Sequence, residues 1–273
     1  MSFIFILESL KFYKMKSERV VQLLFLLTLG INLLFSFYNP GDSDFSALQS
    51  YLLRELVPAT TVVTTNFPTP VSTGNLIFLG WRLLQFALNL LLSFFYASAY
   101  TAERQGLPAV KGLKAMAVVL PQVLGLGLLL IVPALLSVFL LWIPLIILTL
   151  MLFMTPLILA DQRVTLRQAM QTSADLSHKR KGFFFGLFFL LFLLASMAES
   201  LLLSFSESLT LVYLVVYAFL ATLYVLMRGR LIGLIYYFFS RHPQISRFYL
   251  YTRDRQKELF EDITGSPPHS PDT

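Results

Sequence analysis

Long runs of apolar residues, separated by short polar segments, dominate the chain. A helix needs about 20 mostly apolar residues to cross the roughly 30 Å of hydrocarbon in a bilayer. Four runs meet this requirement, at residues 20–38, 76–100, 183–205 and 209–237. The stretch 115–160 contains no charged residue, and as one helix it would measure about 69 Å, roughly twice the membrane thickness. It therefore predicts two further spans, 115–136 and 137–159, joined by a turn between Val132 and Ser137.

The basic residues test this count, because the cytoplasmic loops of membrane proteins carry an excess of Lys and Arg. With six spans, almost all of them fall on one side: Lys11, Lys14, Lys16, Arg19, Arg104, Lys111, Lys114, Arg163, Arg167, Lys179, Arg180, Lys181, Arg228, Arg230, Arg241, Arg247, Arg253, Arg255 and Lys257. Only Arg54 and Arg82 remain for the other side. The pattern predicts a multi-pass protein of the bacterial plasma (inner) membrane with both termini in the cytoplasm.

Composition agrees with a membrane protein and narrows the functional classes. The chain is 56% hydrophobic and 13% charged, whereas soluble domains average about 45–50% apolar and about 25% charged residues. The net charge of +6 is spread among the apolar runs, so it marks topology and does not form a stripe for nucleic acid. The chain has no Cys, which excludes disulfides, thiolate metal sites and cysteine catalysis.

The predicted fold is all-α, a polytopic six-helix transmembrane bundle with amphipathic interfacial helices. Residues 1–19 form a cytoplasmic amphipathic segment, residues 20–240 the membrane domain, and residues 241–273 a charged tail that ends in a disordered stretch. The N-terminal pattern predicts a helix lying in the membrane interface. Its apolar side contains Ile6, Leu7, Leu10 and Tyr13, and its other side Glu8, Lys11 and Lys14.

Two more interfacial helices are predicted. Residues 42–56 have helical apolar spacing, with Asp44 in position to cap the N-terminus. In the cytoplasmic segment before the fifth span, Thr165 and Gln168 have the spacing of a capping box. The helix that follows turns one side toward the bilayer or the bundle, and that side contains Leu166, Ala169, Met170, Ala174 and Leu176.

The middle of the chain resembles the YciC-like family of bacterial inner-membrane proteins. The resemblance rests on a proline-containing turn at Pro133, a span that ends in Pro156 and Asp161, the amphipathic helix 166–173, and the basic run 178–184. An Arg near the end of the last span, Arg228 or Arg230, also fits the family. The match covers roughly residues 115–205. It implies architecture and location only, because the family carries no established reaction.

Two ionisable residues, Arg82 and Glu199, are expected at similar depths in the outer half of the membrane. Charged groups at such depths are costly and normally pair or face a cavity. They are therefore candidates for an intramembrane ion pair, or for a solute or proton site. The structural alternative is that both reach the outer interface or form a pair that only stabilises the bundle.

Prolines and glycines suggest where the spans bend and approach one another. Pro121, Pro144 and Pro156 are candidate hinges, because a proline within a helix frees a backbone carbonyl. Their alternative role is ordinary packing. The pairs Gly182/Gly186 and Gly229/Gly233 have the small-xxx-small spacing that allows close helix approach in the fifth and sixth spans.

Candidate binding chemistry is limited. Lys179, Arg180 and Lys181 are predicted to contact anionic lipid headgroups, although ordinary positive-inside anchoring explains them equally well. The three histidines, His178, His242 and His269, lack metal-ligand spacing. No catalytic or nucleotide-binding motif occurs in a suitable context. The sequence therefore predicts no enzyme activity, no metal and no cofactor.

The leading functional prediction is a non-enzymatic accessory or structural component of the envelope that contacts membrane lipids or a membrane or cytoplasmic protein partner. The alternative is a transporter or permease-like protein for a small or amphiphilic solute, with the proline-containing hairpin as its moving part. An intramembrane enzyme is the third hypothesis. No nucleic-acid partner is expected.

Overall fold

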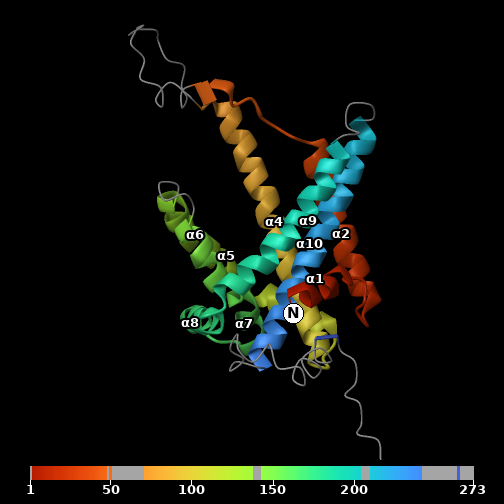
Figure 1. The fold of residues 1–273 in the computed structure, drawn as a ribbon, viewed down its shortest axis with the longest axis vertical. Helices are drawn as coiled ribbons and strands as arrows, with labels where there is room; N and C mark the ends of the chain where they lie inside the picture. Colours follow the sequence, from red (N-terminus) through yellow and green to blue (C-terminus); the bar gives the residue numbers. More distant parts are fainter. Residues whose placement is uncertain are drawn as a thin grey trace, which may run out of the picture.

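The computed structural model describes residues 2–47, 49–50, 71–137, 143–203, 210–241 and 263–264 (Figure 1). Its helices are α1 (Ser2–Leu10), α2 (Glu18–Phe37), α4 (Thr73–Arg104), α5 (Ala109–Ser137), α6 (Ile143–Leu152), α7 (Thr155–Gln162), α8 (Leu166–Ser177), α9 (Lys181–Leu203) and α10 (Thr210–Arg241). No strand occurs in the described part of the chain. Six segments are long and apolar enough to cross a membrane, with α6 and α7 together forming one of them. The all-α, six-span prediction is confirmed.

Helix α10 lies at the centre of the bundle. It packs against α4 and α2 along its length and against α1 and α9 on its other sides. On the far side of α4, α5 and α7 form a second group, and α8 packs against α6 and α7. Helices α4, α6 and the α9–α10 pair spread apart toward the end opposite α1 (Figure 1). The tightest packing therefore lies at the end of the bundle that carries α1, α7 and α8.

This end carries most of the basic residues, and we call it the basic end. It comprises the α1–α2 and α4–α5 connections, the segment from α7 to the start of α9, and the last turns of α10 (Figure 1). Successive basic segments lie at the same end only if the chain crosses the bundle an even number of times between them. Their position at one end agrees with the even number of crossings that the six-span prediction requires.

Close contact between α4 and α10 depends on two glycines. A Cβ atom on Gly229 would lie 2.7 Å from the Ser93 carbonyl oxygen, and one on Gly233 would lie 3.0 Å from that of Ala97. The Ser93 hydroxyl uses this proximity to donate to the Val225 carbonyl at 3.0 Å. Gly182 and Gly186 have no such neighbour within 4 Å. The packing prediction is therefore right for α10 and wrong for α9 within the described chain.

Helix α5 is longer than predicted. It continues through Pro121 and Pro133 to Ser137, so the expected turn between Val132 and Ser137 is wrong. Proline removes one backbone donor, but transmembrane helices tolerate this when other groups satisfy the freed carbonyls. The carbonyl that Pro133 leaves without its helical donor is that of Leu129, one turn earlier, and the Ser137 hydroxyl donates to the Pro133 carbonyl at 2.6 Å one turn later. The predicted boundary between spans 115–136 and 137–159 shifts accordingly, and the connection to α6 falls in 138–142, outside the described residues.

The fourth span is interrupted. Helix α6 ends at Leu152, Phe153 and Met154 form a turn, and α7 begins at Thr155 with Pro156 in its first turn. Proline lacks the N–H that would continue the α6 hydrogen-bond ladder, and its fixed φ suits the start of a new helix. The predicted continuous span 137–159 is therefore two helices.

Helix α8 is docked against this interruption. The Met151 carbonyl, near the end of α6, accepts a hydrogen bond from the Ser173 hydroxyl at 2.7 Å. The buried line of α8 is Ala169, Ser173 and Ser177, so two serines join the predicted apolar face. Thr165 and Gln168 form the predicted capping box. A carbonyl left over at the α6–α7 break thus fixes the position of an amphipathic helix.

Two other predicted segments are only partly described. Residues 46–47 and 49–50 are helical, and the Asp44 carboxylate accepts from the Ser46 backbone N–H at 2.8 Å, as expected of a cap. This hydrogen bond lowers the pKa of Asp44. Residues 48 and 51–56, and the tail 241–273 apart from Arg241 and 263–264, lie outside the described residues.

The glycine packing gives a paired test. We expect Gly229→Ala to destabilise the protein by about 1–3 kcal/mol, because its methyl group would press on the backbone of Ser93. Gly186→Ala should leave stability unchanged or slightly raised, because its methyl group meets no neighbour and alanine restricts the unfolded chain. Thermal unfolding in detergent, followed by size-exclusion chromatography, compares the two. Equal stability of the two variants would contradict the close α4–α10 contact.

Candidate functional site

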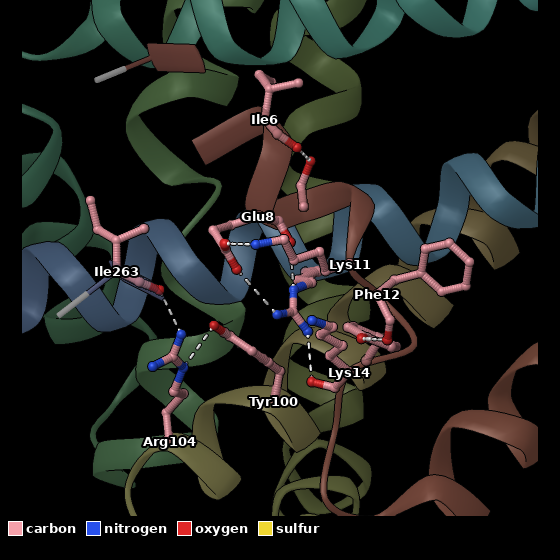
Figure 2. A network of polar contacts seen from close by, with 11 residues as sticks. Ile6, Glu8, Lys11, Phe12, Lys14, Tyr100, Arg104 and Ile263 are labelled. Carbon is pink, nitrogen blue, oxygen red and sulfur yellow. Dashed lines mark hydrogen bonds and ion pairs between the residues drawn. The ribbon is translucent and has the colours of Figure 1, made fainter. Parts of the chain in front are cut away.

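The polar interior of the basic end is built around Arg230 of α10. Figure 2 shows its partners Glu8 and Lys14. The last carbonyls of a helix lack intrahelical donors and need partners when they are buried. Arg230 supplies hydrogen-bond donors to carbonyls of α1 and of the segment after it. Its Nε donates to the Glu8 carbonyl at 2.7 Å, and its Nη1 donates to the Lys14 carbonyl at 3.0 Å. One guanidinium group thus holds the N-terminal segment on α10.

Glu8 neutralises this buried cation. Its Oε2 lies 3.6 Å from Arg230 Nη2, and both side chains are about 95% buried. The Lys11 ammonium also contacts the Glu8 carboxylate, and the Arg230 guanidinium lies 4.9 Å from the centre of the Tyr100 ring. Arg suits this position because its planar guanidinium can stack on an aromatic ring and its several N–H groups can donate to different acceptors.

The prediction for α1 therefore needs a correction. Leu7 and Leu10 are exposed, as a membrane-facing side requires, but Glu8 and Ile6 are buried together against the bundle. The side that carries Glu8 was expected to face water. It faces Arg230 instead, because a buried cation on α10 requires a carboxylate partner.

Helix α4 completes the anchorage. The Tyr96 hydroxyl donates to the Phe12 carbonyl, and the Glu103 carboxylate accepts from the backbone N–H groups of Lys16 and Ser17 at 3.0 and 2.7 Å. Carbonyls and N–H groups of the segment 8–17 are thus bonded by side chains from two long helices.

A short piece of the tail returns to the same region. The side chain of Ile263 is buried, and its carbonyl accepts from Arg104 Nη2 at 2.7 Å (Figure 2). Arg104 also donates from Nε to the Tyr100 hydroxyl at 2.8 Å. This contact was not predicted, because an isolated Ile within a charged tail has no periodic pattern.

On the opposite side of α4, the Asp161 carboxylate joins three helices. It accepts from Gln105 Nε2 at 3.0 Å and from the Tyr236 hydroxyl at 2.6 Å. Asp161 lies near the end of α7, Gln105 directly follows α4, and Tyr236 belongs to α10. Each carboxylate oxygen thus accepts one hydrogen bond, and Asp161 links the end of α7 to α4 and α10.

Beside Asp161, α4, α5 and α7 enclose a cavity of about 730 Å³, which we call the α4–α5–α7 groove. This volume is within the usual range for small-molecule sites. The lining consists of Ser98, Thr101, Ala102, Gln105, Leu107, Lys111, Gly112, Lys114, Ala115, Val118, Val119, Gln122, Leu157, Leu159, Ala160, Asp161, Arg163 and Val164.

The groove has a basic part and an apolar part. Lys111, Lys114 and Arg163 are exposed, and their side chains make no hydrogen bond or ion pair within the described chain. Further along α5 the lining becomes apolar, and Val118 is 79% exposed, so the groove is open to the side. The arrangement is suited to a molecule with an anionic group at one end and an apolar body.

The predicted pair Arg82 and Glu199 is not joined by an ion pair within 4 Å in the described structure. Arg82 Nη1 donates to Gln85 Oε1 at 3.0 Å, and its guanidinium lies 5.3 Å from the Phe78 ring. Both charges nevertheless lie within electrostatic range of Tyr217 on α10. Their proposed role as a solute site stays a prediction.

Arg82 is the first member of a polar cluster that the sequence reasoning missed. Asn32 of α2 accepts from Gln85 at 3.3 Å and from Asn89 at 2.9 Å, and it donates to Thr222 of α10 at 3.3 Å. Asn32 and Thr222 are fully buried. A signal existed, because Gln85, Asn89 and Ser93 recur every four residues within an apolar span.

One turn further along α4, Ser93 accepts from Arg228 Nε at 3.0 Å. Arg228 is buried, and its Nη2 has no hydrogen-bond partner among the described residues. The same holds for Asn89 Oδ1. Buried polar atoms without partners are costly, so this is the least satisfied part of the described interior.

The candidate hinges lie in different places. Pro121 is inside α5, Pro144 is the second residue of α6, and Pro156 follows the break between α6 and α7. Only Pro156 coincides with an interruption between two described helices. The position of a proline does not show whether the helix moves about it, so the hinge assignments stay predictions.

The basic run before α9 is divided in its contacts. Arg180 lies over the Phe239 ring at 4.7 Å and donates to the Leu176 carbonyl at 3.0 Å, and partial burial lowers its pKa. Lys179 is exposed, with φ of 62°, and Lys181 is the first residue of α9. Contact of Lys179, Arg180 and Lys181 with anionic lipid headgroups stays a prediction.

Within the described residues, no group of three or more His, Asp or Glu side chains could hold a metal ion. His242 and His269 lie outside those residues. Comparison with known proteins finds no matching family model, curated protein or solved structure. The functional conclusion therefore rests on the geometry of this chain.

The Arg230 network predicts a strong effect of a small change. Glu8→Gln should destabilise the protein by about 3–5 kcal/mol, because it leaves a buried guanidinium without its counter-charge. The exposed Glu18→Gln variant makes the same chemical change and should cost about 1 kcal/mol or less.

Thermal unfolding measures both variants, and limited proteolysis of residues 1–17 reports release of α1. The double variant Glu8→Gln/Arg230→Gln should recover part of the loss, since it removes both charges. Equal stability of the Glu8 and Glu18 variants would rule out the buried pair as an anchor.

Proposed function

We propose that this integral membrane protein is a non-enzymatic accessory component of the envelope that holds an amphiphilic molecule in the α4–α5–α7 groove. The observation that carries the proposal is the groove itself, with unpaired Lys111, Lys114 and Arg163 at one end and a side opening at Val118. Its carboxylate, Asp161, is occupied by Gln105 and Tyr236. Cations, an apolar lining and a carboxylate that already accepts hydrogen bonds support the binding of a molecule and no reaction of it.

We further propose that the protein lies in the bacterial inner membrane, with its basic end and both termini in the cytoplasm. The excess of Lys and Arg in the segments at this end supports the orientation. There the exposed side of α8 and the lysines Lys179 and Lys181 are available to a protein partner or to anionic headgroups. Membership of the YciC-like family is proposed on the residue pattern in 115–205.

Purification in nanodiscs formed directly from native membranes tests the function. Mass spectrometry of everything that accompanies the protein should find one class of amphiphile enriched over the bulk lipid. Ala115→Phe should remove this enrichment, because the new ring would occupy the groove that Ala115 lines.

Ala117→Phe is the matched control, because Ala117 is exposed on the same helix and does not line the groove. It should leave the enrichment intact. A protein that carries only bulk lipid, or an enrichment that both variants retain, would overturn the proposal. A stoichiometric protein partner that survives both changes would identify the accessory pathway.

Transport is the second candidate, and the buried polar cluster favours it. From Arg82 to Ser93 the cluster follows α4 for about 17 Å, roughly half the hydrocarbon thickness. It includes the unpartnered Asn89 Oδ1 and Arg228 Nη2. Polar groups at this depth often mark solute pathways.

The transport candidate predicts that Arg82→Ala or Glu199→Ala abolishes a solute phenotype while the protein stays folded and abundant. A strain that lacks the protein, complemented with each variant and exposed to a panel of small and amphiphilic solutes, provides the measurement. The exposed Arg167→Ala is the control for loss of a basic side chain. Full complementation by both variants would remove the transport candidate.

A further inference from the structure

We infer that the ligand of the α4–α5–α7 groove is an anionic phospholipid of the surrounding bilayer, with its phosphate at Lys111, Lys114 and Arg163 and an acyl chain along α5. This inference rests on the proposed function and identifies its ligand class. Four observations carry it: the cations, the side opening, the depth of the groove and an isolated polar side chain.

The cations converge from two helices. Lys111 and Lys114 are three residues apart on α5, so they project from the same face. Arg163 ends α7 in a left-handed conformation with φ of 52°, which places it on the groove from the opposite wall. A phosphate diester between them gains charge-assisted hydrogen bonds that the protein itself does not supply.

The one carboxylate in the lining does not compete for these cations. The Asp161 oxygens accept from Gln105 and Tyr236, which fixes the carboxylate among α4, α7 and α10. The charge balance of the groove is therefore positive. An amphiphile with a negatively charged headgroup therefore fits the groove better than one with a positively charged headgroup.

The opening to the side selects a lipid over a water-soluble phosphate. Val118 lines the groove and is 79% exposed, and Leu129 and Val132, on the same side of α5 further along, are 52% and 63% exposed. This surface continues from the groove onto the apolar face of a helix long enough to cross the membrane. A ligand can therefore enter from the bilayer with its acyl chain already in contact with α5.

Gln122 adds an independent indication of depth. It lines the groove about 17 Å along α5 from Lys111, is exposed, and has no hydrogen-bond partner in the described chain. An amide that faces hydrocarbon is costly unless it is bonded. Lys114 lies about 12 Å before Gln122 along α5, so a phospholipid with its phosphate at Lys114 brings its ester carbonyl acceptors into the part of the groove between the two side chains.

The test uses the full-length protein in nanodiscs of phosphatidylcholine that contain a minority of phosphatidylglycerol. Native mass spectrometry counts the lipids that stay bound as the surrounding bilayer is stripped. We expect one retained phosphatidylglycerol per chain. Lys111→Gln/Lys114→Gln should weaken its retention about thirtyfold, from about 1 kcal/mol for each basic residue near a charged headgroup.

The matched control is Lys179→Gln/Lys181→Gln, which removes the same charge from the basic end outside the groove. It should leave the retained lipid in place. Equal loss from the two double variants would mean general surface attraction and would overturn the inference. Binding of free glycerol phosphate by a protein that retains no phosphatidylglycerol would also overturn the inference, in favour of a soluble phosphate ligand.

The outcome separates this inference from the proposed function. If Ala115→Phe expels a native amphiphile that contains no phosphate, the groove is a binding site and the phospholipid assignment is wrong. If Ala115→Phe changes nothing in native membranes and no phosphatidylglycerol is retained, the proposed function itself fails. Retention of phosphatidylglycerol that depends on Lys111, Lys114 and Ala115 supports both.

Discussion

The partly buried backbone from the end of α1 to the start of α2 is the constraint on which the basic end of this protein depends. Its carbonyls and N–H groups have no helix or sheet to bond with, and a buried unpaired backbone group costs as much as a lost hydrogen bond. Arg230, Tyr96 and Glu103 satisfy them from α10 and α4. A guanidinium buried for this purpose then needs a carboxylate, and Glu8 of α1 provides it. One requirement thus fixes three helices relative to each other.

The position of α4 in turn shapes the two sides of the bundle differently. Toward α10 the packing is close enough for Gly229 and Gly233 to approach its backbone. Toward α5, the Gly112 backbone approaches Ser98, whose hydroxyl donates to the Gly112 carbonyl at 2.9 Å. Beyond this contact the two helices and α7 leave the α4–α5–α7 groove between them. The closely packed side of α4 therefore supports an open side that has unpaired cations.

Polar side chains in the apolar spans serve two different purposes. Ser173 donates to a carbonyl at the α6–α7 break, and Thr222 accepts from Asn32 between α10 and α2, which is how polar side chains support breaks and contacts between membrane helices. Asn89 and Arg228 retain atoms with no partner among the described residues, although both residues make other hydrogen bonds. The first set explains the architecture. The second set is where the transport candidate finds its support.

Hydrophobic length and charge parity determined the six spans, their approximate limits and the grouping of basic segments, because a bilayer imposes these on any sequence that crosses it. Local chemistry also determined the Thr165–Gln168 capping box. Only the tertiary structure decided that Glu8 faces inward, that α5 passes through Pro133, and that Lys111, Lys114 and Arg163 share one groove. These features depend on residues far apart in the chain. A periodic pattern says which side of a helix differs from the other, but not whether water, lipid or another charge lies beside it.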